Sequence, residues 1–158
     1  MKLSSLLLEL KVNSSSRVHL SNKPFKLEKR TYKQDDAMKP AGFWYGFGNE
    51  WIDWVRTEMS SKFSGDYIYN VDVSKCKLLK IDSHMELMIF TRHYNSPASQ
   101  VVGDKLDWKT ISTRYDGIEI NPYQDEARYQ YLWYYGWDVA SGCVWNLDKL
   151  KISQLNLK

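Results

Sequence analysis

Residues 42–59, GFWYGFGNEWIDWVRTEM, predict a buried strand that leads directly into an amphipathic helix. Consecutive aromatic rings between glycines are typical of a strand in a sheet, and Gly46 and Gly48 then favour a turn. Asn49 is a suitable helix N-cap, and Glu50 suits the first helical turn. The residues expected to face the core follow at helical spacing, namely Trp51, Trp54, Val55 and Met59.

Short elements separated by turns continue on both sides of this stretch. We expect strands at residues 17–21, 67–73, 78–81, 118–120 and 139–147, and a short apolar segment at 150–152. Helices are expected at 84–94 and 106–115, with the inward-facing residues Met85, Met88, Ile89, His93, Trp108 and Ile111. Because helices do not regularly separate the strands, this order favours an α+β fold with a split, mostly antiparallel β-sheet and short flanking helices.

Length and composition indicate one soluble domain. A chain of 158 residues normally closes around a single core, which we place at about 17–152. Aromatic residues make up 15% of the chain, too much apolar surface for a disordered protein. No stretch approaches the ~20 apolar residues of a membrane span. Glu9 interrupts the apolar start, and no small-residue cleavage site follows. We therefore expect a cytoplasmic protein without a membrane partner.

The sequence lacks the common catalytic and phosphate-binding templates. It contains no Gly-x-x-x-x-Gly-Lys loop, no Gly-x-Ser-x-Gly elbow and no His-Glu-x-x-His helix. The two cysteines, Cys76 and Cys143, do not have metal-ligand spacing, so we expect buried thiols and no metal site.

Two aromatic or polar clusters are candidates for ligand binding. Arg17, His19 and Ser21 share the polar face of the expected strand 17–21, where their polar atoms could meet a ribose hydroxyl or an amide. Three consecutive rings in one strand cannot all face the core, so Trp44 or Tyr45 could stack on a flat heteroaromatic ring. The alternative for Arg17, His19 and Ser21 is the ordinary polar face of an edge strand. The alternative for Trp44 and Tyr45 is tight packing on both faces of the sheet.

A third candidate is the aromatic segment 123–145. Tyr and Trp at this density favour a loop that recognises a partner or substrate. Stacking on single-stranded bases is less favoured, because only Arg128 is positive while Asp125, Glu126 and Asp138 oppose it. Plain core packing is the alternative.

Three stretches together resemble the ADP-ribosyltransferase fold, especially its small phage and bacterial members. They are YNVDVSKCKLLKID at 69–82, YDGI at 115–118 and CVWNLDKLKI at 143–152. The resemblance follows the order of elements over residues 17–152. It implies that NAD is the substrate, that His19 or Arg17 together with Ser21 contact its nicotinamide ribose or amide, and that Tyr45 stacks on the nicotinamide.

The family also implies a carboxylate near the start of the closing strand, which stabilises the cationic ribose as nicotinamide leaves. Residues 137–143, WDVASGC, contain no glutamate. Asp138 and Ser141 are the nearest polar candidates there. Glu119 lies one strand earlier, between two isoleucines, where alternation turns it to the other face. Glu119 or Asp138 is therefore expected to be the catalytic acid, unless the domain only binds.

The resemblance implies a toxin-like or effector-like mono-ADP-ribosyltransferase that modifies a macromolecule and can meet an antitoxin or inhibitor protein. A protein side chain is the default acceptor. Residues 1–40 carry nine basic and four acidic side chains, which leaves a nucleic acid acceptor open. The rival functions are a non-catalytic module that binds a partner through segment 123–145 and a nucleic-acid binder that uses the basic N-terminal part.

Overall fold

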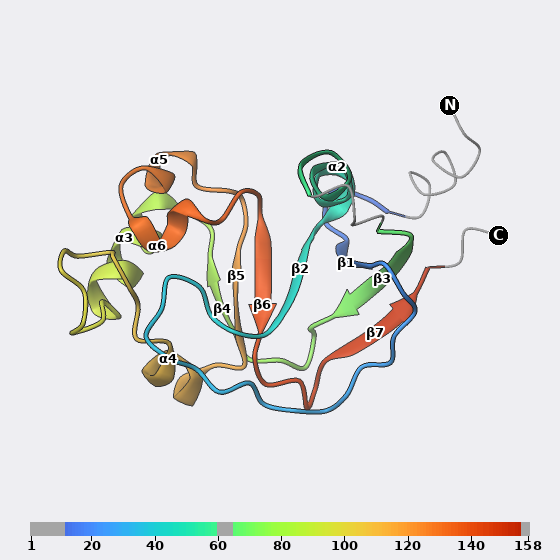
Figure 1. Cartoon of the computed structure of the whole chain (residues 1–158), viewed down its shortest axis with the longest axis horizontal. Helices are drawn as coiled ribbons and strands as arrows, with labels where there is room; N and C mark the ends of the chain where they lie inside the picture. The colour runs from blue at the N-terminus through green and yellow to red at the C-terminus, as the bar shows by residue number, and fades with distance from the viewer. Residues whose placement is uncertain (1–11, 60–64, 156–158) are drawn as a thin grey trace.

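The computed structural model describes residues 12–59 and 65–155. Within them the chain is α+β, with a seven-stranded, mostly antiparallel sheet and short helices (Figure 1). In chain order the elements are β1 (Arg17–Ser21), β2 (Phe43–Phe47), α2 (Gly48–Glu58), β3 (Tyr67–Asp72), β4 (Leu78–Ile81), α3 (His84–His93), α4 (Trp108–Arg114), β5 (Gly117–Ile120), α5 (Asp125–Arg128), α6 (Leu132–Tyr135), β6 (Ser141–Val144) and β7 (Lys151–Gln154).

The strands follow the order β4-β5-β6-β2-β1-β3-β7, and β4 and β5 form its parallel pair. β2 pairs with β6 from Phe43 to Gly46, but it pairs with β1 only at Gly46 and Phe47. The sheet therefore opens between β2 and β1, and Figure 1 shows the strands on the two sides running in different directions. The expected split is a local opening in one continuous sheet.

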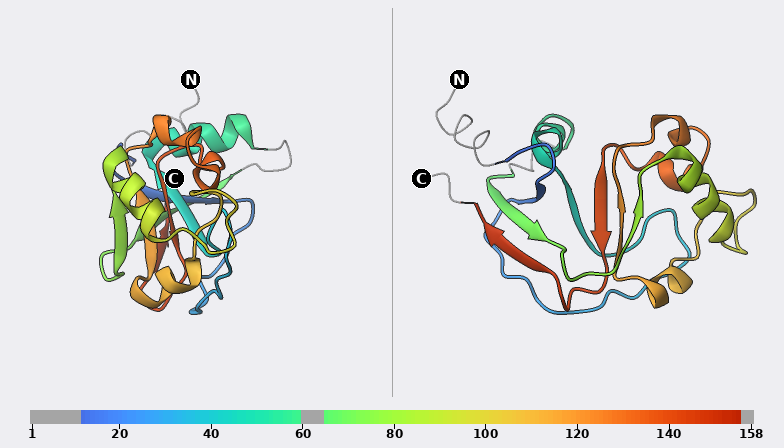
Figure 2. Two further views of the ribbon diagram at one scale, coloured as in Figure 1. Left: turned by 90° about the vertical axis from the view of Figure 1, so that its left-hand side faces the viewer. Right: turned by 180° about the vertical axis from the view of Figure 1, so that it is seen from behind.

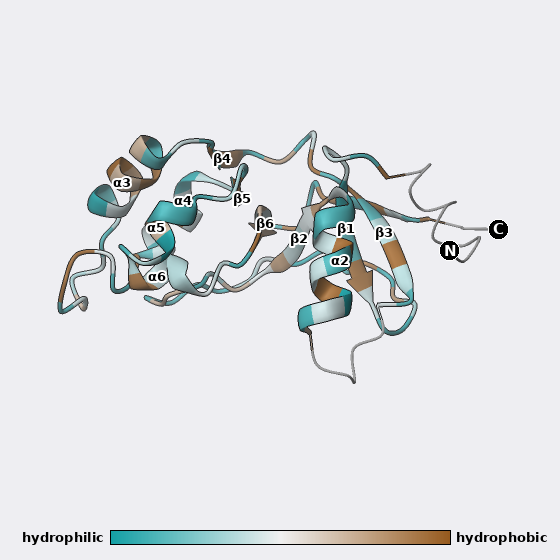
Figure 3. Cartoon of the chain, turned by 90° about the horizontal axis from the view of Figure 1, so that it is seen from above, coloured by the Kyte–Doolittle hydropathy of each residue, from teal (hydrophilic) through white to brown (hydrophobic). Residues whose placement is uncertain are grey.

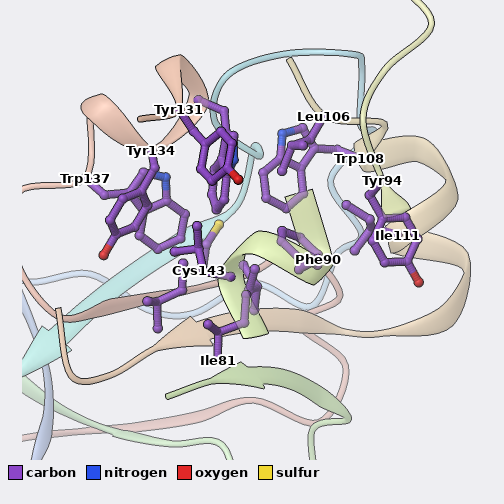
Figure 4. Packing of buried hydrophobic residues seen from close by; sticks show 14 of the residues in the cluster. Ile81, Phe90, Tyr94, Leu106, Trp108, Ile111, Tyr131, Tyr134, Trp137 and Cys143 are labelled. Carbon is purple, nitrogen blue, oxygen red and sulfur yellow. The ribbon is translucent and has the colours of Figure 1, made fainter. Parts of the chain in front are cut away.

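The main core lies between β4-β5-β6-β2 and the helices α3 to α6. Figure 4 shows its rings packed against the strands, with Trp108, Tyr134 and Trp137 among them. Burial of such rings is the main stabilising contribution, because each removes ~150–250 Å² of surface from water. The predicted recognition segment therefore supplies core: its buried rings are Tyr131, Trp133, Tyr134, Trp137 and Trp145, while Tyr129 and Tyr135 are exposed.

The inward face of α3 differs from the sequence prediction. Leu87, Phe90 and Thr91 are buried, whereas Met85 and Ile89 are 65% and 61% exposed. Apolar residues occur around most of this helix, so two faces fit the helical spacing, and packing of Phe90 against Trp108 and Trp133 decides between them. The predicted burial of Trp108 and Ile111 in α4 is confirmed.

Helix α2 packs on the same face of the sheet, over β1 and β2, and shares a small core cluster with Ile68 of β3. Its buried residues include Ile52 and Val55, while Trp51 and Trp54 stack on each other half-buried and Met59 is exposed. The helix begins at Gly48, one residue before the expected cap, and Gly48 adopts φ 57°, a left-handed conformation that favours glycine at this turn. Figure 3 shows α2 in the half of the molecule that holds β1 and β3, and α3 to α6 gathered in the other half.

Residues 22–40, which we call the strap, end against the main core through Ala37 and Met38, and the earlier part of the strap covers the opposite face of the sheet. Figure 2 shows the strap running along the lower edge of the strands. Its apolar residues Phe25, Leu27 and Tyr32 pack against a second core cluster on this face. A backbone hydrogen bond from Tyr32 N to Trp145 O, 2.8 Å long, fixes it to the chain after β6.

None of the helices in residues 12–59 and 65–155 combines the length and the apolar composition that a bilayer-crossing helix needs.

Candidate functional site

One row of residues crosses four neighbouring strands on the strap side of the sheet. Lys80 in β4 is paired with Glu119 in β5, Glu119 with Gly142 in β6, and Gly142 with Tyr45 in β2. Side chains of paired residues point to the same face of a sheet. The row therefore brings a cation, a carboxylate and a phenol onto one surface, away from the helices.

Three donors hold the Glu119 carboxylate. Arg17 Nε donates to Glu119 Oε2 over 2.7 Å, and Arg17 Nη2 donates to Oε1 over 3.0 Å. Tyr45 donates its phenolic proton to Oε2 over 2.6 Å. The two arginine bonds form the bidentate geometry that gives strong charge-assisted pairing. Among these contacts Oε1 accepts one hydrogen bond, so it retains a lone pair for a ligand hydroxyl.

Gly142 makes the contact between Tyr45 and Glu119 possible. The Tyr45 ring crosses the backbone of Gly142, and a Cβ atom there would lie 2.3 Å from Tyr45 Cζ and 2.4 Å from its oxygen. Any other residue would push the ring away from the carboxylate. A glycine inside a strand often marks such a close approach, and this is the sequence signal that could have placed Gly142 in the site.

Burial and the ion pair determine the proton affinities of the donors. The hydrogen bond to Glu119 is the main reason that the pKa of Arg17 is raised. Burial, followed by the charge of Glu119, raises the pKa of Tyr45 well above its ordinary value. Tyr45 therefore stays protonated at any physiological pH and acts as a hydrogen-bond donor.

Arg17 connects the buried acid with the surface. Its side chain is 28% exposed, whereas that of Glu119 is 7% exposed. Arg17 lines two adjoining hollows of about 230 Å³ and 350 Å³, which we call the Arg17 hollows. Lys80 and Cys76 lie in the first and Lys151 in the second, while Asp72 lines both. A ligand in these hollows would meet the guanidinium first and the carboxylate behind it.

His19 closes the opening between β1 and β2. Its Nδ1 lies 2.6 Å from the Trp44 carbonyl oxygen, and its ring stacks on Phe43 with the centroids 4.2 Å apart. Burial lowers the pKa of His19, although the Trp44 carbonyl opposes the shift. The neutral ring with a proton on Nδ1 fits this arrangement, because Nδ1 then donates to the carbonyl.

The other expected site residues lie apart from Glu119. Ser21 donates to the carbonyl of Lys23 in the turn after β1. Trp44 points to the helical face, where it packs against Trp137. Ser141 alternates with Gly142, so its hydroxyl faces the helical side and donates to the Val139 carbonyl. The structure thus brings together Arg17, Tyr45 and Glu119 from the predicted set.

Asp138 lies in the connection between α6 and β6, where its Oδ1 is 3.2 Å from Nη2 of Arg128. This half-buried pair is separate from the row of Glu119. Of the two predicted acids, only Glu119 is paired with Arg17, which lines the hollows. Tyr45 also differs from expectation: its ring is fully buried, so it orients the carboxylate and offers no face for stacking.

Cysteines and metal ligands contribute little to this site. Cys143 is buried as predicted, and Cys76 is half-buried; both carry free thiols. Burial raises the pKa of both thiols, which disfavours the reactive thiolate. Among the described residues, no group of three or more His, Cys, Asp or Glu side chains could hold a metal ion.

Comparison of the chain with models of protein families, with curated proteins and with solved structures gives no match. The functional interpretation therefore depends on the geometry around Glu119 and on the resemblance of the sequence stretches described above.

Proposed function

We propose that this chain is an NAD-dependent mono-ADP-ribosyltransferase in which Glu119 is the catalytic carboxylate. The observation that carries the proposal is the convergence of Arg17, Tyr45 and Glu119 from three strands, with Arg17 at the wall of the Arg17 hollows and the other two residues buried behind it. A carboxylate in this position would face a charged ligand bound by the guanidinium. The sequence resemblance supports the same reaction through Arg17, although Glu119 lies one strand before the position at which the family has its carboxylate.

The reaction breaks the bond between nicotinamide and C1′ of the ribose. The bonding electron pair leaves with nicotinamide, and the ribose becomes an oxocarbenium-like cation. Fixed negative charge beside that cation lowers the barrier, and Glu119 supplies it while Oε1 accepts a ribose hydroxyl. An acceptor nucleophile then attacks C1′ and loses its proton.

Arg17 and Tyr45 have positioning roles in this scheme. They hold the carboxylate in one orientation, so that little reorganisation is needed when charge develops. The bonds to Glu119 use Nε and Nη2 of Arg17, which leaves Nη1 for the pyrophosphate of NAD. Lys80 and Lys151, which line the two Arg17 hollows, add positive charge on either side.

The test is release of nicotinamide from NAD, measured by chromatography. Glu119→Gln keeps the size of the side chain and one acceptor oxygen but removes the negative charge. We expect it to lower the rate at least about 100-fold. Asp138→Asn is the matched control, since it neutralises another arginine-paired carboxylate, and we expect a change below about twofold. A wild-type protein that binds NAD without releasing nicotinamide, or equal rates in both variants, would contradict the proposal.

A further inference from the structure

Two adjoining hollows lie between the strap and the end of the sheet, next to the Arg17 hollows. They measure about 510 Å³ and 190 Å³, and Phe25, Lys26 and Leu27 line both. We call them together the basic trough. The larger hollow shares Lys151 and Ile152 with one of the Arg17 hollows, so the trough leads towards Arg17.

The trough is strongly positive. Its lining carries four cations, Lys26, Lys29, Arg30 and Lys151, against the single carboxylate of Glu28. The stretch of the strap from Lys23 to Lys33 contains five basic residues and one acidic residue. Charge of one sign along a concave surface attracts a polyanion and raises its association rate.

Planar groups line the same surface. The half-buried Phe25 ring packs edge-on against Tyr69, with the centroids 4.7 Å apart. The Arg30 guanidinium lies over the Tyr32 ring, 4.1 Å from its centroid. Aromatic rings and arginine planes are the surfaces on which unpaired bases stack. An acidic peptide would use the lysines, but it has no flat base to stack on these planes.

Hydrogen bonds within the chain hold the strap in place. Lys29 Nζ donates to the carbonyl oxygens of Asp148 and Leu150 over 2.7 Å and 2.9 Å. Leu147 N donates to Arg30 O over 2.9 Å, and Phe25 N donates to the Tyr69 hydroxyl over 3.1 Å. The trough is therefore preformed, and a ligand does not have to order it.

We propose that the basic trough binds single-stranded nucleic acid, with bases against Phe25 and the Arg30–Tyr32 pair and phosphates along Lys26 and Lys151. This binding does not require NAD. Together with the proposed function, it also names the acceptor class, because a strand in the trough extends past Lys151 towards Arg17 and Glu119. The acceptor role, but not the binding, rests on the proposed function.

The experiment measures fluorescence anisotropy of a labelled oligonucleotide of about ten nucleotides without NAD, between about 50 and 200 mM salt. The wild-type affinity should fall linearly with salt on logarithmic axes. The double variant Lys26→Glu/Lys151→Glu should bind at least about tenfold more weakly, and its salt slope should be smaller by about one to two. Lys109→Glu on the exposed side of α4 is the charge control and should bind more tightly than the double variant.

A second variant separates stacking from charge. Phe25→Leu keeps an apolar side chain but removes the planar ring, so affinity should fall about fivefold or more with an unchanged salt slope. Thermal unfolding of each variant confirms that the strap region is folded. Equal weakening by Lys109→Glu, or an unchanged affinity in Phe25→Leu, would overturn the proposal. So would displacement of the strand by polyglutamate at equal charge concentration, which would identify an acidic peptide as the better ligand.

Failure of one proposal can be told from failure of the other. Glu119→Gln alters no residue of the trough, so it should bind the oligonucleotide as tightly as the wild type. A wild-type protein that binds the strand but does not release nicotinamide contradicts only the proposed enzyme. A wild-type protein that releases nicotinamide but does not bind the strand contradicts only the proposed role of the trough.

Discussion

The phenol of Tyr45 reaches the Glu119 carboxylate across the backbone of Gly142, on the strand between them. The hydrogen bond is 2.6 Å long and is buried. A carboxylate away from water is unfavourable unless strong donors satisfy it. Arg17 and Tyr45 supply those donors, so the position of the acid depends on both side chains.

Gly142→Ala should be destabilising. Its Cβ would overlap the Tyr45 ring, which has no free space because it is fully buried. We expect the free energy of unfolding in urea to fall by about 1–3 kcal/mol. Gly136→Ala is the control, because its Cβ would meet only the flexible end of Lys39. Equal small effects for both would show that the ring is not confined by Gly142.

Tyr45→Phe removes one donor from the buried carboxylate while keeping the ring. A hydrogen bond to a charged group contributes about 1.5–3 kcal/mol, so the free energy of unfolding of Tyr45→Phe should be lower than that of the wild type by this amount. Tyr129→Phe serves as the reference, since Tyr129 is 83% exposed and its loss of a hydroxyl should change stability by less than about 0.5 kcal/mol. Denaturant titration measures the free energy of unfolding of both variants. Equal losses in Tyr45→Phe and Tyr129→Phe would argue against a strong hydrogen bond between Tyr45 and Glu119.

A double-mutant cycle with Arg17→Met and Glu119→Gln should reveal strong coupling. Each single change leaves a partly buried partner unpaired, which we expect to cost about 2 kcal/mol, with a coupling energy of about 1.5 kcal/mol. The same cycle at Arg128 and Asp138, a more exposed pair 3.2 Å apart, should give less than about 0.5 kcal/mol. Similar coupling at both pairs would mean that the site pair is no more than a surface contact.

His19 should make stability depend on pH. Because burial lowers its pKa below the ordinary 6.5, the unfolded chain binds a proton that the folded chain does not as pH falls below about 6.5. The free energy of unfolding should therefore decrease between about pH 7 and pH 5, and be unaffected by this residue above that range.

His19→Asn keeps a donor that can reach the Trp44 carbonyl but does not titrate, so its stability should fall less over the same range. His93→Asn, at an exposed position, should retain the wild-type pH dependence. A wild-type decrease that persists unchanged in His19→Asn would assign the effect to other groups.

Local patterns were enough to predict much of the fold. The glycine-bounded aromatic strand lies where it was expected, and the strand at 17–21 and Glu119 between two buried isoleucines have the expected orientation. Period-two alternation is a local property, so it reveals which face a residue occupies. The meeting of Arg17 with Glu119, 102 positions apart, depends on strand order, and no local pattern encodes strand order.

For segment 123–145, the local pattern predicted the wrong environment for most of the rings. Its aromatic density suggested a recognition loop, but two short helices fold its rings into the main core. Density of Tyr and Trp does not by itself separate a recognition surface from a core, because both bury the same rings. The four-residue helices were missed, since elements this short show no complete period.

In the proposed function, Glu119 stabilises the transition state for loss of nicotinamide. The most direct test is the turnover number of folded Glu119→Gln at saturating NAD, alongside its Kd for NAD. We predict turnover at least about 100-fold below the wild type with Kd changed less than about threefold. Turnover equal to that of the wild type would contradict the claim.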